Sequence, residues 1–304
     1  MRYKITKRCL IFWCMFIGLG ALYGSIMMFI DPTGKLLQMD GLIKYFQVLP
    51  FSDVLFKNYI FSGISLLIVN GITNFIATYF LIKNKKAGPI LGIIFGCTLI
   101  LWIIIQFIIF PTNILSIAYF IFGIIQLLTG YMTYIFYHQA YFKFDINEYQ
   151  NIGTNKDILV VYFSRLGYTK RTAYEKANEI GADILELTTK ERTKDTLGFL
   201  WCGRFGMHKW GMPIEPININ IKSYKKIIIV SPIWVFDVSA PIREFCTKYK
   251  NDINEVEYIV THYMKAKFMK VADNLDKIIG KKRLSYTSIS VRLGKVKKIM
   301  YKGK

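Results

Sequence analysis

The sequence lacks the patterns that hold most disulfide and metal sites. Its five cysteines, Cys9, Cys14, Cys97, Cys202 and Cys246, are scattered with no CxxC pair, and its three histidines lie far apart. Neither a disulfide framework nor a zinc site is therefore indicated, and no HExxH motif points to a metalloenzyme. We expect no bound metal and a reduced, cytoplasmic setting for the soluble part of the chain.

Acidic residues are scarce, and charge is segregated from apolar sequence. The chain has 40 Lys plus Arg against 20 Asp plus Glu, yet 53% of it is hydrophobic. Residues 1–150 carry 11 basic and 5 acidic residues, whereas residues 151–304 carry 29 and 15, a net charge of +14. Such a surplus suits anionic lipid, where each Lys or Arg contributes about 1 kcal/mol, or an acidic redox partner. No nucleic-acid-binding motif is present, so we expect no nucleic-acid partner.

Three long stretches lack charge altogether: residues 9–30, 59–82 and 87–142. A helix crosses the hydrocarbon core with about 20 residues, so the third stretch is too long for one span. The sequence "FPTN" at 110–113 contains its only turn signal, and Pro111 removes a helix donor, which divides the stretch into 89–110 and 114–137. The sequence therefore predicts a domain of four transmembrane helices over residues 1–142.

The loop charges predict how these spans are oriented. Basic residues cluster before the first span and at 83–86, whereas the loop 31–58 balances three Lys against three Asp. Positive-inside asymmetry then places both termini and the soluble domain in the cytoplasm of a multi-pass cell-membrane protein. No Asp, Glu, Lys or Arg lies inside a span, which argues against a carrier or channel. We expect Asn70, Asn74 and Gln106 to form hydrogen bonds between helices.

After a polar linker at 143–156, the pattern changes to alternating strands and helices. Strands are predicted at 157–163, 182–189, 225–231, 255–261 and 284–291, and helices at 169–180, 241–250 and 268–279. This alternation predicts a doubly wound α/β domain over 157–304 with a parallel five-stranded sheet. The insertion at 190–222 carries Trp201, Phe205 and Trp210, which would dock at the bilayer interface, cover a ligand or form a plain hydrophobic flap.

Two loops follow predicted strands where such sheets bind ligands. In "SRLGYT" (164–169), Gly167 permits a positive φ before a helix N-terminus, which makes either an anion cradle or only a capped turn. In "PIWVFDVSA" (232–240), Trp234 and Phe236 are suited to stack on a planar ring, or Trp234 packs under the loop. Walker A and GxGxxG motifs are absent, which argues against a nucleoside triphosphatase or a nicotinamide-binding domain.

The stretches "VVYFSRLGYTKRTA" and "IIIVSPIWVFDVSAPIREFC" together resemble the flavodoxin family over residues 157–291. The resemblance implies a strand order of the type 2-1-3-4-5 and non-covalent FMN. It assigns the FMN phosphate to the first loop: Ser164, Arg165, Leu166, Gly167, Tyr168 and Thr169. It assigns the isoalloxazine ring to two further segments: Pro232, Ile233, Trp234, Val235 and Phe236, with Thr261, His262 and Tyr263 after the fourth strand.

Two functions are the main candidates, and a third, a small-molecule activity of the four-span half that the flavin domain would regulate, is disfavoured by the uncharged spans. The first is a membrane-anchored flavodoxin-like protein that transfers electrons between a cytoplasmic donor and a membrane-associated acceptor such as a quinone. The flavin would perform the chemistry, so no catalytic side chain is assigned. The alternative is a membrane sensor or interaction protein with a cofactor-free module, because Leu166 and Tyr168 stand where the family usually has a hydroxyl residue and often has Asn.

Overall fold

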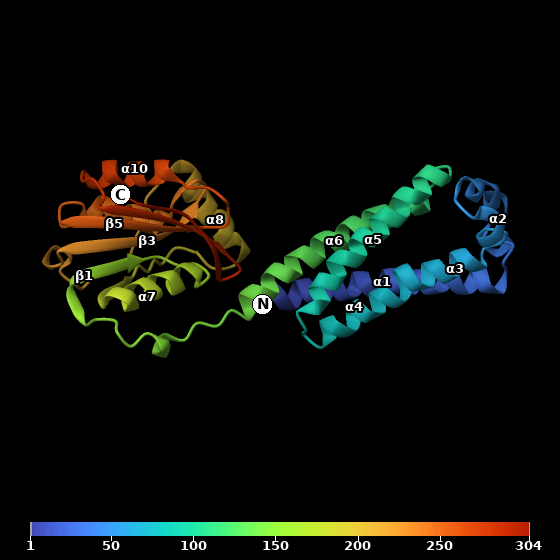
Figure 1. Cartoon of the computed structure of the whole chain (residues 1–304), viewed down its shortest axis with the longest axis horizontal. Coiled ribbons are helices and arrows are strands. Elements are labelled where there is room, and N and C mark those ends of the chain that lie inside the picture. Colours follow the sequence, from blue (N-terminus) through green and yellow to red (C-terminus); the bar gives the residue numbers. More distant parts are fainter. Residues whose placement is uncertain (1, 304) are drawn as a thin grey trace. The chain divides into compact units, whose positions relative to one another are not determined.

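The computed structural model describes residues 2–303, the side chains of residues 195 and 196 excepted. The chain forms two compact units, Met1–Tyr141 and Phe142–Lys304, which we describe separately (Figure 1). The first is helical and the second contains all of the β-strands of the described residues. The α/β unit thus begins at Phe142, before the predicted linker.

The helical unit contains the four predicted spans. They are α1 (Arg2–Ile30), the continuous run of α3 (Ile60–Leu66), the π-helix η3 (Leu67–Ile72) and α4 (Thr73–Ile82), then α5 (Ala87–Ile109) and α6 (Ile114–Ala140). All four are long and apolar enough to cross a membrane, and the predicted break at Pro111 is confirmed. Short helices fill the loop between the first two spans: η1 (Lys35–Leu37), η2 (Asp40–Val48) and α2 (Ser52–Leu55).

Glycine and amide side chains hold these helices together. A Cβ atom at Gly96 would lie 2.7 Å from the backbone nitrogen of Leu127, so only glycine allows α5 and α6 to approach this closely. Gln126 of α6 donates a 2.7 Å hydrogen bond to Asn74 Oδ1 of α4. The predicted bonding between helices is confirmed for Asn74, whereas the side-chain polar atoms of Asn70 have no partner among the described residues.

The α/β unit is built on one sheet in the order β2-β1-β3-β5-β6-β7. Its strands are β1 (Asn155–Tyr162), β2 (Ala182–Glu186), β3 (Lys226–Trp234), β4 (Asp237–Val238), β5 (Glu255–His262), β6 (Ser285–Arg292) and β7 (Lys295–Gly303). The helices between them are α7 (Tyr168–Ile180), α8 (Asp195–His208), α9 (Ala240–Tyr249) and α10 (Met269–Ile279), with the short helices η4 (Ile146–Glu148) and η5 (Ile221–Ser223). The order of the five parallel strands matches the predicted order.

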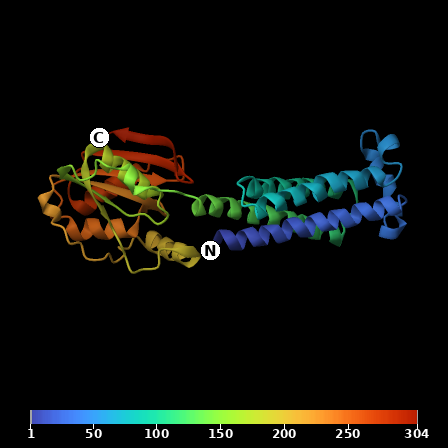
Figure 2. The ribbon, with the colours of Figure 1, turned by 90° about the horizontal axis from the view of Figure 1, so that it is seen from below.

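The prediction of five strands is wrong, because the sheet has seven. β4 is a short antiparallel return of the β3 hairpin. After β6, Leu293 and Gly294 both adopt positive φ, at 51° and 78°, and this turn sends the chain back as the antiparallel strand β7 (Figure 2). A two-residue turn of this kind favours a hairpin, so the chain adds an edge strand after β6.

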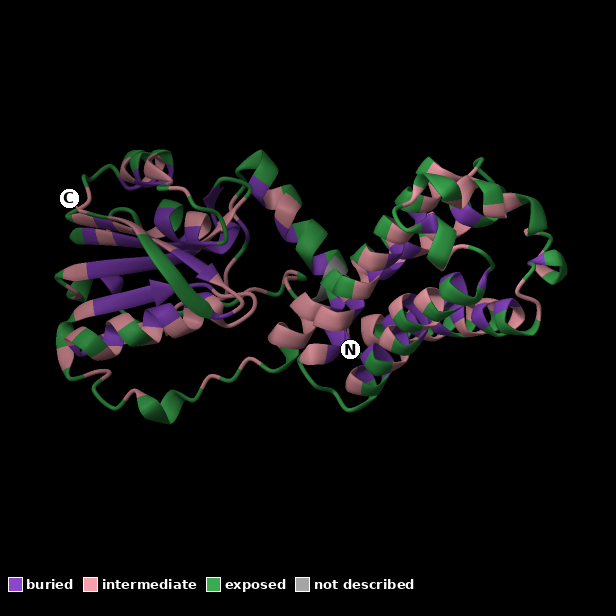
Figure 3. Cartoon of the chain, turned by 45° about the vertical axis from the view of Figure 1, so that its right-hand side comes forward, coloured by how far each residue is buried: buried purple, intermediate pink, exposed green. Residues whose placement is uncertain are grey.

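Helices cover both faces of the sheet, with α7 on one and α10 on the other (Figure 1). Val160 and Tyr162 face α7 and pack with Ala173 and Ala177, whereas alternate strand residues pack on Phe245 of α9 and its neighbours. The central strands are buried on both sides (Figure 3). This double burial explains why their sequences are continuous apolar runs.

The segment before β1 packs against α7. Phe142 meets the ring of Tyr168 edge-on with centroids 4.8 Å apart, and Phe144 meets Tyr174 at 5.0 Å. Arg171 ties the segment down by donating hydrogen bonds to the carbonyl oxygens of Lys143 and Gly294. Residues from the predicted linker therefore contribute to the fold of the α/β unit.

Candidate functional site

The candidate site lies at the carboxyl ends of three neighbouring strands. Parallel pairing sets Tyr162 of β1 level with Val230 of β3, and Val230 level with Ile259 of β5. The loops that follow these strands therefore meet at one edge of the sheet, which is where doubly wound sheets bind ligands. All three predicted binding segments lie at this edge, in the last residues of β3 and β5, in the loops that follow β1, β3 and β5, and in the first residues of α7.

The first loop has the geometry of an anion cradle. Gly167 adopts φ +85° and caps the N-terminus of α7, and its N–H donates a 3.0 Å hydrogen bond to Ser164 Oγ. The N–H groups of the first turn of a helix have no intrahelical acceptor, and the helix dipole adds partial positive charge there. The half-buried Arg165 and Leu166 form the outer part of this loop.

Two predicted phosphate contacts are turned into the protein. Thr169 is buried, and its hydroxyl pairs with the hydroxyl of Thr261 at 2.8 Å, which joins α7 to the end of β5. Tyr168 lies against Phe142, and burial raises the pKa of its phenol. Its hydroxyl has no hydrogen-bond partner among the described residues. The side chains of both positions therefore lie against other parts of the unit.

The charges near the loop are partly neutralised within the unit. Lys170 forms a 2.7 Å ion pair with Glu186 at the end of β2, and Arg171 holds two backbone carbonyls. The guanidinium of Arg165 lies 5.1 Å from the ring centre of Phe199 in α8. Arg165 is the basic side chain of the loop itself.

The second loop is a tight hairpin between β3 and β4. Its two central residues, Val235 and Phe236, adopt φ of 46° and 64°, a conformation that costs about 1–3 kcal/mol for each residue other than glycine. The hairpin exposes 69% of the Phe236 side chain. Such strain at an exposed aromatic residue is a feature of ligand-binding loops.

Polar contacts beneath the hairpin hold this strained turn. The backbone N–H of Ser239 donates to Ser231 Oγ at 3.0 Å, and the hydroxyls of the two serines lie 3.2 Å apart. Asp237, buried at the turn, pairs with Arg243 of α9. Pro232 accepts a backbone bond from Ser239, and Ile233 pairs with Val238 across the hairpin. No sequence pattern indicates this ion pair, because its partners meet only through the geometry of the hairpin.

Trp234 is half-buried and supports the hairpin from behind. Its ring meets Phe163 edge-on with centroids 5.5 Å apart, and it packs beside Cys202, Met212 and Ala240. Trp234 thus packs under the loop, which was the alternative to stacking on a ring, and it is still partly exposed.

The third segment is the end of β5 and the loop that follows it, and its predicted residues have different surroundings. His262 is buried on the α10 side, where its ring nitrogens lie 2.7 Å from the Met264 carbonyl oxygen and 2.8 Å from Ser288 Oγ. Burial lowers the pKa of His262. Tyr263 is 56% exposed, with the guanidinium of Arg292 4.7 Å from its ring centre. Tyr263 is therefore the accessible aromatic residue of this loop.

Helix α8, which lies in the insertion at 190–222, borders the site, as in the ligand-covering role that the sequence left open for this insertion. Phe205 and Cys202 pack with Trp234, and Gly206 approaches the hairpin so closely that a Cβ atom would lie 3.1 Å from Val235 Cγ2. Phe199 lies over Arg165 of the first loop. The buried residues recur at helical spacing, which was the available signal for a packed helix.

Comparisons with known proteins found similarity only among solved structures. No family model and no curated protein matches the chain. A flavoprotein in complex with FMN from Lactobacillus acidophilus is 22% identical, with a TM-score of 0.39, over 44% of this chain and 93% of its own. A putative flavoprotein from Bacteroides eggerthii is 23% identical, with a TM-score of 0.38, over 44% of this chain and 86% of its own. The apo form of the Lactobacillus protein is 22% identical, with a TM-score of 0.35, over 46% of this chain and 92% of its own. Likeness at this level leaves the function to be argued from the site itself.

The burial of His262 predicts a pH dependence of stability. An unfolded histidine takes up a proton near pH 6.5, whereas the lowered pKa keeps folded His262 neutral, so the free energy of unfolding falls as the pH drops below about 6.5. The slope from this residue is at most about 1.4 kcal/mol per pH unit. His262→Gln should reduce the slope measured by urea-dependent pulse proteolysis between neutral and mildly acidic pH. His208→Gln, at an exposed position, is the control, and equal slopes for the two variants would contradict the assignment.

Proposed function

We propose that the α/β unit binds FMN at the carboxyl edge of its sheet and transfers electrons between a cytoplasmic donor and a membrane-associated acceptor. The observation that carries this proposal is the meeting of an anion cradle with exposed aromatic residues on neighbouring loops. Gly167 and the α7 N-terminus fit a phosphate, and Phe236 and Tyr263 fit a planar ring. FMN combines these two chemical features.

In this proposal the residues position the cofactor and shield it. The first-turn N–H groups of α7 and the Arg165 guanidinium hold the phosphate dianion, and Ser164 keeps the Gly167 turn in place. Trp234 and the strained hairpin hold Phe236 against one part of the ring, and Tyr263 borders another. The bound flavin supplies the redox chemistry, so no acid or base side chain is required.

The four apolar helices would anchor this unit to the cell membrane. The clusters of basic residues before α1 and between α4 and α5 favour a topology with both termini in the cytoplasm. The donor would then be a soluble protein or reductant of the cytoplasm, and the acceptor a redox protein or quinone in the membrane.

Variants at exposed aromatic residues test the proposed flavin site. Phe236→Ala and Tyr263→Ala should each weaken FMN binding to the purified full chain by about 10-fold, because stacking on an aromatic ring contributes about 0.5–1.5 kcal/mol beyond buried area. Gly167→Val should abolish binding, because valine does not tolerate φ +85°. Flavin fluorescence during titration with FMN measures the affinities.

The matched control is Leu284→Ala, which removes a similarly exposed apolar side chain just before β6, at the amino edge of the sheet. It should leave FMN affinity unchanged. If all three aromatic and apolar variants bind FMN alike, the ring does not lie between these loops.

We further propose that the outer face of α8 contacts anionic lipid. Leu200 and Met207 are 62% and 64% exposed on this face, and Trp210 is 46% exposed. Arg204 lies over the rings of both Trp201 and Trp210, at 5.3 and 5.6 Å. Apolar and aromatic residues combined with cations are typical of helices that lie in the membrane interface.

A spin label can test the contact of α8 with lipid. In full-length protein with Cys9 and Cys97 changed to serine, a nitroxide on Met207→Cys should be more accessible to oxygen than to a water-soluble nickel complex in nanodiscs that contain anionic lipid. The same label on Leu284→Cys should show the reverse. Equal accessibility at the two sites would exclude insertion of α8.

The cofactor-free alternative has its own structural support. The Thr169 hydroxyl is already paired with Thr261, and Tyr168 packs against Phe142, so neither offers its hydroxyl to a phosphate without rearrangement. An interaction module would use the exposed Phe236 and Tyr263 to bind a protein partner. Absence of FMN binding by the wild-type chain, with the fold intact by circular dichroism, would favour this alternative.

A further inference from the structure

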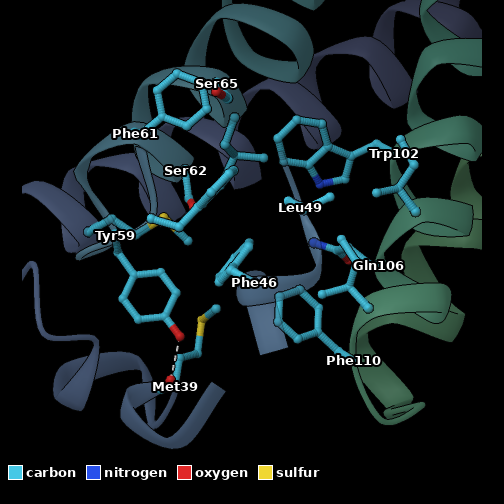
Figure 4. A pocket seen from close by; sticks show the side chains of 15 residues that line it. Met39, Phe46, Leu49, Tyr59, Phe61, Ser62, Ser65, Trp102, Gln106 and Phe110 are labelled. Carbon is cyan, nitrogen blue, oxygen red and sulfur yellow. Dashed lines mark hydrogen bonds between the residues drawn. The ribbon is translucent and has the colours of Figure 1, made fainter. Parts of the chain in front are cut away.

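The helical unit contains a pocket that the proposed flavin site does not explain (Figure 4). It lies among the short helices between α1 and α3, the start of α3 and the end of α5, and its volume is about 210 Å³. A cavity of about 150 Å³ holds benzene, so this pocket holds a single six-membered ring with several substituents.

Aromatic side chains form much of the pocket wall. Phe46 stacks on Phe56 with centroids 4.6 Å apart and meets Phe110 edge-on at 4.8 Å. Tyr59, whose hydroxyl donates to the Met39 carbonyl oxygen, and Phe61 continue the lining. Walls built of ring faces and edges favour a planar ligand.

The polar groups of the pocket are neutral and are mainly hydrogen-bond donors. Ser62 is only 8% exposed, and its Oγ has no hydrogen-bond partner among the residues that the structure describes. A helical serine often donates to a carbonyl oxygen of its own helix, and Ser62 makes no such bond, so its hydroxyl can donate to an acceptor on a ligand. In Figure 4, the side-chain nitrogens of Trp102 and Gln106 face the same cavity as the Ser62 hydroxyl.

The donor set selects the ligand chemistry. The Trp102 indole only donates, and Gln106 Oε1 already accepts from Ser116 Oγ at 3.4 Å, which leaves its N–H groups for a ligand. None of the described residues that line the pocket is Asp, Glu, Lys, Arg or His, so an ionic ligand would lie there without a counter-charge. A lipid acyl chain would leave the donors unpaired, whereas ring carbonyls would accept from them.

We propose that this pocket binds the ring of a neutral, lipid-soluble carbonyl compound of the p-benzoquinone class, with its carbonyl oxygens accepting from Ser62 and Gln106. The pocket lies at the end of the helical unit where α5 ends and α6 begins, whereas the chain leaves this unit at the other end of α6. Because the pocket and the start of the α/β unit are at opposite ends of α6 in sequence, we propose binding at this pocket and no electron transfer from the proposed flavin site.

Binding of tetramethyl-p-benzoquinone to the full chain in nanodiscs tests this proposal. All its ring positions are methylated, so it does not add to the exposed thiols of Cys9 and Cys97. Saturable quenching of tryptophan fluorescence reports binding, and the saturable component should disappear in Trp102→Phe. Durene, the hydrocarbon with the same ring and methyl groups but no carbonyl oxygens, is compared through its ability to displace the quinone.

Ser62→Ala should weaken quinone binding about 3- to 10-fold, the effect of one lost neutral hydrogen bond, and leave durene unaffected. Gln106→Leu should give a second loss of similar size. Ser25→Ala is the control, because that buried hydroxyl donates to the Ala21 carbonyl oxygen in its own helix and does not line the pocket. Non-saturable quenching, durene binding as tight as quinone binding, or unchanged affinity in both pocket variants would overturn the proposal. The FMN content of the same samples keeps this result separate from the proposed flavin function.

Discussion

The parallel pairing of β3 with both β1 and β5 is the constraint on which the candidate site depends. It sets the ends of the three strands level, so that segments far apart in the sequence meet at one edge. The buried hydroxyl pair of Thr169 and Thr261 then joins the first and third of these segments. A shift in this register would separate the anion cradle from the aromatic loops, even if each loop kept its own conformation.

The hairpin between β3 and β4 is strained, and this strained conformation sets the position of Phe236. Val235 and Phe236 adopt left-handed conformations that neither residue type favours, and buried polar contacts beneath them compensate for the strain. Helix α8 packs on the same hairpin through Gly206. Because the turn is supported on two sides, Phe236 can be held exposed at a fixed place without packing of its own.

Much of the fold could be predicted, because its elements carry strong local patterns. The uncharged runs gave the four helices, and the continuous apolar runs gave the parallel strands, since both depend on the burial of the element itself. β7 was missed because six of its nine residues are exposed, so the strand Lys295–Gly303 shows no apolar periodicity in the sequence. β4 was missed because two residues are too few to produce a pattern.

The positions of the site loops could be predicted, whereas the directions of their side chains could not. A glycine between a strand and a helix marks a turn, but the contact that draws Tyr168 inward comes from Phe142, which lies before the first strand. His262 likewise follows a strand that was read correctly, yet its ring turns toward Ser288 on the neighbouring strand. Such partners are set by tertiary packing, which a single sequence does not display.

The flavin content of the purified chain decides whether the α/β unit binds FMN as we propose. The full-length protein, extracted gently from its membrane, would be examined for the yellow absorbance of oxidised flavin and for FMN released on denaturation. We expect FMN in stoichiometric amounts, restored by added FMN where some has been lost in purification. Folded protein that carries no flavin and takes up none at high FMN concentration would contradict it.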